Sequence, residues 1–76
     1  MKQYKKLPNH IQLLAEEKVV IFRNNPYDQR LKTHKLSGKL LGNYAFSLNS
    51  SYRIIFSFEN KNLSKFYQIG NHDIYE

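Results

Sequence analysis

Two of the three histidines and one arginine could perform acid–base chemistry on a phosphate group. They are His34, Arg53 and His72. A histidine gains or loses a proton near neutral pH, and an arginine can stabilise the charge that develops on a phosphate during cleavage. Such groups can cleave RNA without a metal ion. One takes the proton from a ribose 2′-hydroxyl, which attacks the adjacent phosphate, and another protonates the departing 5′-oxygen.

The same histidines are poorly suited to bind a metal. Structural and catalytic zinc sites use three or four protein ligands. The chain has no cysteine, and His34 and His72 lie far apart in the sequence. We therefore expect no metal and no other cofactor. The third histidine, His10, lies near the start of a predicted helix, and we assign it a surface or capping position without a chemical role.

Positive charge surrounds His34. Four cations with no acid between them follow residue 29, at Arg30, Lys32, Lys35 and Lys39. The whole chain carries a net charge of +6 and has a pI near 9.7, a balance that favours nucleic acid, an anionic membrane or an acidic protein as partner. The basic segment has two interpretations at this point. It is either a solvated face that promotes solubility or an edge that binds phosphates.

A central strand is expected to position Arg53. Residues 52–58 are rich in β-branched and aromatic side chains and contain neither Gly nor Pro. Successive side chains of a strand point to opposite faces. One face would therefore carry Ile54, Phe56 and Phe58, and the other Arg53, Ile55 and Ser57. Burying an unpaired guanidinium is costly, so we expect the second face to be solvated or occupied by an anion.

Two further strands are expected beside the central one, over residues 44–49 and 63–69. A three-residue connection before the last strand would place Phe66 opposite Phe56 and keep Lys65 off the core face. Antiparallel turns would then return His72 to the start of the central strand, near Tyr52 and Arg53. With His34 approaching from the basic segment, these side chains would gather on one polar sheet face.

A helix is predicted before the sheet. Apolar residues at helical spacing run through residues 7–24, and Asn24-Asn25-Pro26 ends the pattern. We expect an α+β fold in which an N-terminal helix or helical hairpin packs on one face of a three-stranded antiparallel sheet. The chain would be a single domain over residues 1–76, with a helical part (7–24), a basic loop (25–43), a sheet (44–69) and a catalytic tail (70–76).

The size and composition limit the location of the protein. A chain of 76 residues supports one modest core, and it has no stretch apolar and long enough for a signal peptide or a membrane span. The absence of cysteine suits a reducing compartment. We therefore expect a cytoplasmic protein with no membrane partner.

Three segments resemble motifs of the RelE/ParE toxin superfamily, and of its YafQ-like and RelE-like members in particular. Residues 25–38 read NPYDQRLKTHKLSG and are similar to the family pattern NPxDxRLKxHKLSG. Residues 52–56 resemble its (L/Y)RIIF strand, and residues 69–75 resemble its closing IGxHD-aromatic motif. The motifs follow one another in the family's order, and the resemblance extends over residues 7–76.

The resemblance implies a toxin of a type II toxin–antitoxin pair that cleaves translated mRNA as a ribosome-dependent endonuclease. It implies that His34 and His72 match catalytic histidines, that Arg53 matches a catalytic arginine and that Tyr75 corresponds to a C-terminal catalytic aromatic residue. The expected RNA contacts are Arg30, Lys32, Lys35, Lys39 and Tyr52. The implied partners are an acidic, partly disordered antitoxin and the ribosome with its mRNA and rRNA.

The chain departs from the family pattern at several positions. No strand is predicted before the first helix, so the strand over 63–69 would be an exposed edge open to another chain or a second copy. Ser47 and Ser51 stand where YafQ-like enzymes carry a histidine and an acid. Two alternatives therefore remain: a ParE-like gyrase-inhibiting protein binder, which needs no acid–base histidines, and a truncated, inactive toxin that only binds its antitoxin.

Overall fold

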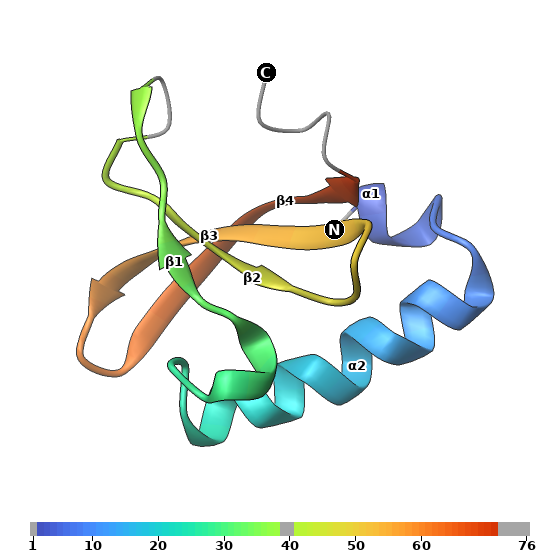
Figure 1. The fold of residues 1–76 in the computed structure, drawn as a ribbon, viewed down its shortest axis with the longest axis horizontal. Coiled ribbons are helices and arrows are strands. Elements are labelled where there is room, and N and C mark those ends of the chain that lie inside the picture. Colours follow the sequence, from blue (N-terminus) through green and yellow to red (C-terminus); the bar gives the residue numbers. More distant parts are fainter. Residues whose placement is uncertain (1, 39–40, 72–76) are drawn as a thin grey trace.

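A computed structural model of the protein describes residues 2–38 and 41–71 and has one helical layer and one sheet (Figure 1). The sheet has four antiparallel strands in the order β1-β2-β3-β4, so each strand pairs with its neighbour in sequence. The elements are α1 (Lys2–Lys5), α2 (Asn9–Asn24), the 3-10 helix η1 (Gln29–Leu31), β1 (His34–Lys35), β2 (Tyr44–Ser47), β3 (Tyr52–Asn60) and β4 (Leu63–Asn71). The predicted α+β class is confirmed.

Helix α2 runs along one face of the sheet (Figure 1). Its buried residues Ile11, Ala15 and Phe22 are spaced four and seven positions apart, which places them on one side of the helix. The helix ends where Asn25 adopts extended backbone angles, φ −158° and ψ 104°. This residue precedes Pro26, whose ring disfavours a helical conformation at the position before it.

Phenylalanines from α2 and the sheet form the centre of the core. The Phe22 ring stacks on Phe46 with 4.9 Å between ring centroids and meets the Phe56 ring edge-on at 4.8 Å. Phe46 and Phe56 are fully buried, and Ile54 belongs to the same cluster. The predicted core face of the central strand is thus confirmed, with Phe58 packed at the margin of the cluster.

The sheet has four strands where the sequence predicted three. The additional strand is β1, which consists of His34 and Lys35 paired with Ala45 and Tyr44. Two residues are too few to show the alternation that identifies a strand, and β1 lies inside the segment that we expected to be a loop. Its pairing depends on β2 and becomes visible only in the assembled sheet.

The predicted pairing of Phe56 with Phe66 is confirmed, but the predicted three-residue connection is wrong. Asn60 pairs with Leu63, so only two residues join β3 to β4. The connection is one residue shorter than predicted, and a bulge at Glu59, between Phe58 and Asn60, compensates for this by shifting the register by one. A second shift lies between Ile55 and Phe56, and it leaves Tyr67 as the extra residue on β4.

Strand β4 lies at one edge of the described sheet, as expected. Near its C-terminal end it contacts α1, whose Tyr4 hydroxyl donates a 2.9 Å hydrogen bond to Glu16 of α2. Among residues 2–38 and 41–71, no helix is long and apolar enough to cross a lipid bilayer.

Candidate active site

The strand register places several polar side chains on the sheet face away from α2, which we call the far face; they include His34, Ser47, Arg53, Ser57, Lys65 and Gln68. One row across the sheet consists of paired residues His34, Ala45, Ile55 and Gln68. The next row consists of Ser47, Arg53 and Gly70. His34 and Arg53 therefore belong to one surface.

The centre of the far face is apolar and buried. Ala45 and Ile55 are 0% and 1% exposed. We expected this face to be solvated or to hold an anion, and the solvated alternative is wrong at its centre. Charged groups beside buried apolar atoms interact more strongly than they do in water. This arrangement suits the stabilisation of negative charge near Arg53.

A hydrogen bond fixes the orientation and tautomer of His34. Its Nδ1 lies 3.0 Å from the carbonyl oxygen of Lys32. A carbonyl oxygen only accepts hydrogen bonds, so Nδ1 carries the proton and Nε2 of the neutral ring has a free lone pair. Lys32 presents this carbonyl from a left-handed backbone conformation with φ 53° and ψ 42°. His34 is exposed, which leaves Nε2 accessible to a ligand.

Arg53 lies on β3 between Ser47 and Gly70. Its Nε atom is buried, so the guanidinium stem is shielded from solvent. The strands that carry His34 and Arg53 are separated by one intervening strand, or about 10 Å between backbones. His34 and Arg53 therefore lie on the same face, two strands apart.

Three predicted site residues lie outside the described part of the chain: His72, Tyr75 and Lys39. The described strand β4 ends at Asn71, which pairs with Tyr52 of β3. The last described residue of β4 therefore lies beside the start of β3, one residue pair from Arg53.

The remaining predicted RNA contacts do not share one surface. Tyr52 packs against the core on the side of α2, so it does not join the polar group on the far face. Lys32 and Lys35 are exposed, but Lys35 follows His34 on β1 and points to the opposite sheet face. Arg30 is engaged in an ion pair with Asp28, with 2.9 Å between Nη2 and Oδ2.

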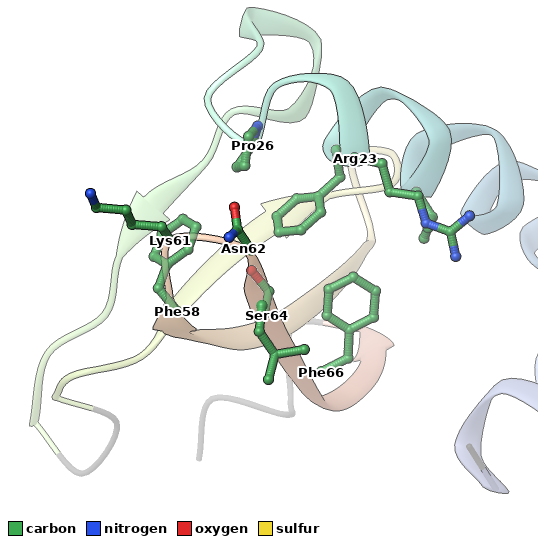
Figure 2. A pocket seen from close by; sticks show the side chains of 10 residues that line it. Arg23, Pro26, Phe58, Lys61, Asn62, Ser64 and Phe66 are labelled. Atoms are coloured by element: carbon green, nitrogen blue, oxygen red, sulfur yellow. The ribbon is translucent and has the colours of Figure 1, made fainter.

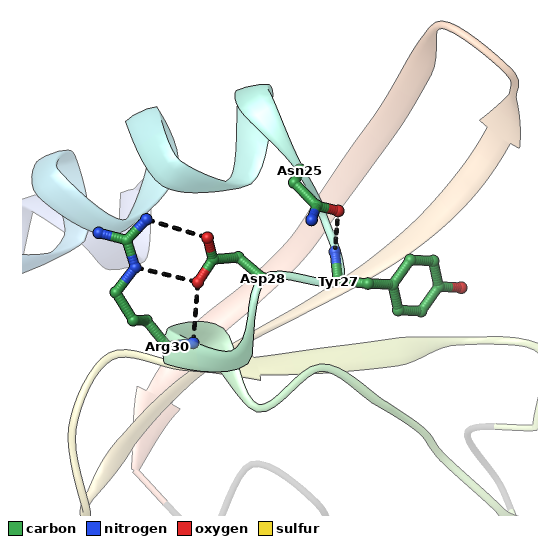
Figure 3. Close-up of polar contacts among 4 residues, drawn as sticks. All are labelled: Asn25, Tyr27, Asp28 and Arg30. Carbon is green, nitrogen blue, oxygen red and sulfur yellow. Dashed lines mark hydrogen bonds and ion pairs between the residues drawn. The ribbon is translucent and has the colours of Figure 1, made fainter.

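The first motif has a clear structural role at its start (Figure 3). Asn25 Oδ1 accepts a 3.0 Å hydrogen bond from the backbone N–H of Tyr27. Asp28 caps η1 by accepting a 2.9 Å hydrogen bond from the backbone N–H of Arg30, and it accepts two more from the Arg30 guanidinium. These contacts turn the chain from α2 into β1, and so they position His34 indirectly.

The Asp28–Arg30 pair predicts a dependence of stability on pH. Hydrogen bonds from the Arg30 side chain are the main cause that lowers the pKa of the Asp28 carboxyl from 3.8 to about 2. The stabilisation is then complete above about pH 4 and is lost as the pH falls towards 2. We expect Asp28→Asn to lower Tm at pH 7, and this difference should shrink towards pH 2.

Thermal melts of both proteins from pH 2 to 7 measure this difference. Asparagine keeps the helix cap, so the variant isolates the charge. Arg30→Gln should produce the same pH-dependent difference because it removes the partner. A Tm difference that is constant with pH would show that the ion pair does not contribute.

Sequence analysis missed Gln68, which lies in the same row as His34. Its Oε1 atom is buried and accepts no hydrogen bond from any residue that the structure describes. Strand alternation from Ile69 could have placed Gln68 on the far face. Ser57 was also given no role, although its hydroxyl donates a 2.6 Å hydrogen bond to Glu59 Oε2 and lies 3.1 Å from the Tyr67 hydroxyl. The bulge at Tyr67 creates that contact, and the sequence carries no signal for it.

Within the described ranges, no three histidine or acidic side chains come close enough together to hold a metal ion. Comparison with known protein families, characterised proteins and solved structures finds no match to this chain. The functional interpretation therefore depends on the residues of the far face and on the motif resemblance.

Proposed function

We propose that the protein is the toxin of a type II toxin–antitoxin system and cleaves mRNA on the ribosome as a metal-independent endoribonuclease. The observation that carries the proposal is the hydrogen bond from His34 Nδ1 to the Lys32 carbonyl. It leaves Nε2 as a base on the same sheet face as Arg53. A base and a cation are two of the groups that promote cleavage of a phosphodiester, together with an acid for the leaving oxygen.

The proposed reaction is an internal transfer within the RNA strand. His34 Nε2 takes the proton from a ribose 2′-hydroxyl, and the 2′-oxygen forms a bond to the adjacent phosphorus. Arg53 stabilises the additional negative charge on the phosphate oxygens. The bond from phosphorus to the 5′-oxygen then breaks, and this oxygen receives a proton from an acid. His72 is proposed as that acid, and Tyr75 as a further catalytic residue.

The proposed partners follow from charge. The net charge of +6 favours binding to rRNA and mRNA phosphates, to which the exposed Lys32 and Lys35 would contribute. An acidic, partly disordered antitoxin would neutralise the same cations and fold on binding. A toxin that acts on ribosomes works in the cytoplasm.

A primer-extension assay on mRNA in a reconstituted translation reaction tests the proposal. We expect the intact protein to produce discrete cuts that require ribosomes. The double variant His34→Ala/His72→Ala should produce none, because it lacks both proton-transfer groups. Addition of EDTA should leave the cuts of the intact protein unchanged.

Other outcomes would favour different functions. Absence of cuts from folded protein that still arrests growth would favour a gyrase-inhibiting protein binder, which can be assayed through DNA supercoiling. Absence of both cuts and growth arrest would favour an inactive toxin that only binds its antitoxin. Either result would overturn the proposed nuclease.

A further inference from the structure

A cavity of about 490 Å³ lies on the other side of the sheet from the far face, between the end of α2 and the β3–β4 hairpin. Figure 2 shows its lining side chains. Its volume is within the range of small-molecule sites. We call it the hairpin pocket and define it by Arg23 of α2, Phe58 of β3, Lys61 and Asn62 of the connection, and Ser64 and Phe66 of β4.

Two cations line the hairpin pocket, and no acid does. Figure 2 shows Arg23 and Lys61 reaching out on opposite sides of the pocket. Both side chains are exposed, and within residues 2–38 and 41–71 neither forms an ion pair. Because the cations lie at opposite ends, they suit a ligand with two separated negative charges better than a single anion.

The interior between the cations is aromatic and polar. Phe58 and Phe66 are half-buried, so part of each ring remains available to a ligand. The Asn62 amide and the Ser64 hydroxyl lie between Arg23 and Lys61 (Figure 2). Their side chains make no hydrogen bond within the described residues. An amide both donates and accepts, as the edge of a nucleobase does.

We propose that the hairpin pocket binds one unpaired nucleotide of single-stranded RNA. The base lies against a phenylalanine ring and contacts Asn62 or Ser64, and the phosphates on its two sides contact Arg23 and Lys61. Aromatic stacking combined with cations along the backbone is a general way to bind single strands. This site would lie on the opposite side of the sheet from His34 and Arg53, and it requires no cleavage by them.

Titration of the full-length, isotope-labelled protein with a trinucleotide of 2′-O-methyl adenosine tests the site by NMR. This probe lacks the attacking hydroxyl and cannot be cleaved. We expect saturable shifts of backbone amide signals at Phe58, Asn62 and Phe66. The slope of log Kd against log salt should fall by about 0.7 for each of Arg23→Ala and Lys61→Ala. Phe66→Leu should weaken binding at least about fivefold through lost stacking.

Matched variants separate this site from general charge and from the proposed nuclease. Lys6→Ala removes an exposed cation outside the pocket and should change neither the salt slope nor the shifts. His34→Ala should slow cleavage in the translation assay by about 10²- to 10⁴-fold and leave the trinucleotide shifts intact. Thermal melts of Phe66→Leu confirm that the variant is folded, because Phe66 also meets the Phe22 ring at 5.4 Å.

Three results would overturn the proposal. The first is that the trinucleotide shifts only the signals of far-face residues, or that it binds the Lys6→Ala variant as weakly as it binds the Arg23→Ala variant. The second is adenosine monophosphate that binds as tightly as the trinucleotide, which would indicate a free nucleotide. The third is an acidic peptide, acetyl-Glu-Phe-Glu-amide, that shifts the pocket signals when the trinucleotide does not, which would indicate a protein partner.

Discussion

Replacing His34 with alanine is expected to slow RNA cleavage by about 10²- to 10⁴-fold, the usual contribution of a general base. The variant loses Nε2, the lone pair left free by the hydrogen bond between Nδ1 and the Lys32 carbonyl. The side chain is exposed, so its loss should leave the core intact. Single-turnover cleavage of ribosome-bound mRNA measures the effect directly.

Two companion variants show whether His34 acts through proton transfer. His34→Asn retains a donor for the Lys32 carbonyl, because its amide nitrogen stands at the position of Nδ1, but it cannot act as a base, so it should be as slow as His34→Ala. Recovery of activity in His34→Asn would show that the histidine only holds the loop. His10→Ala removes another exposed histidine, on α2, and should cleave at the rate of the unmodified protein.

Phe56→Ala is expected to cost about 3–5 kcal/mol of folding free energy, as is usual for a buried phenylalanine. The Phe56 ring is fully buried and contacts Phe22, Tyr44 and Phe46. The total stability of a domain of this size is about 4–11 kcal/mol at 0.05–0.15 kcal/mol per residue. One substitution would therefore remove a large part of it. Urea denaturation followed by circular dichroism measures the change.

A surface substitution provides the control for Phe56. Val20 is 57% exposed on α2, so Val20→Ala should change stability by no more than about 0.5 kcal/mol. If Phe56→Ala is unfolded without denaturant, Phe56→Leu gives a smaller and measurable loss. Equal stability of the Phe56 and Val20 variants would contradict the assignment of the core.

The β4 edge strand and the hairpin pocket lie beside each other, because Ser64 and Phe66 belong to both. An edge strand carries backbone groups that can pair with another chain. Pairing along β4 and nucleotide binding in the pocket would then compete for the same strand. A chain paired along β4 should then weaken binding of the trinucleotide. Such a loss of affinity would link the edge strand to the hairpin pocket.

The faces of the central strand could be read from the sequence. Ile54, Phe56 and Phe58 alternate with Arg53 and Ser57, and this period of two is a local property of an extended chain. The same rule places Tyr52 beside Ile54 on the core side, although we had grouped it with Arg53. The apolar spacing of α2 and its end before Pro26 were likewise local signals.

The candidate site depended on tertiary structure. The two residues of β1 show no period, and only pairing with β2 places His34 in the row of Ile55 and Gln68. The NPxD part of the first motif forms a turn and a helix cap, a role that the spacing of charges did not indicate.

The sequence by itself determined which side of the helix and which face of the central strand lie toward the core, because amphipathic periods act over neighbouring residues. Tertiary structure alone decided the bulges on β3 and β4, which shift the register so that Phe66 meets Phe56 while Gln68 meets Ile55. It also decided that two cations flank one pocket. Strand pairing and helix packing join residues distant in the chain, and their energies depend on all the contacts formed together.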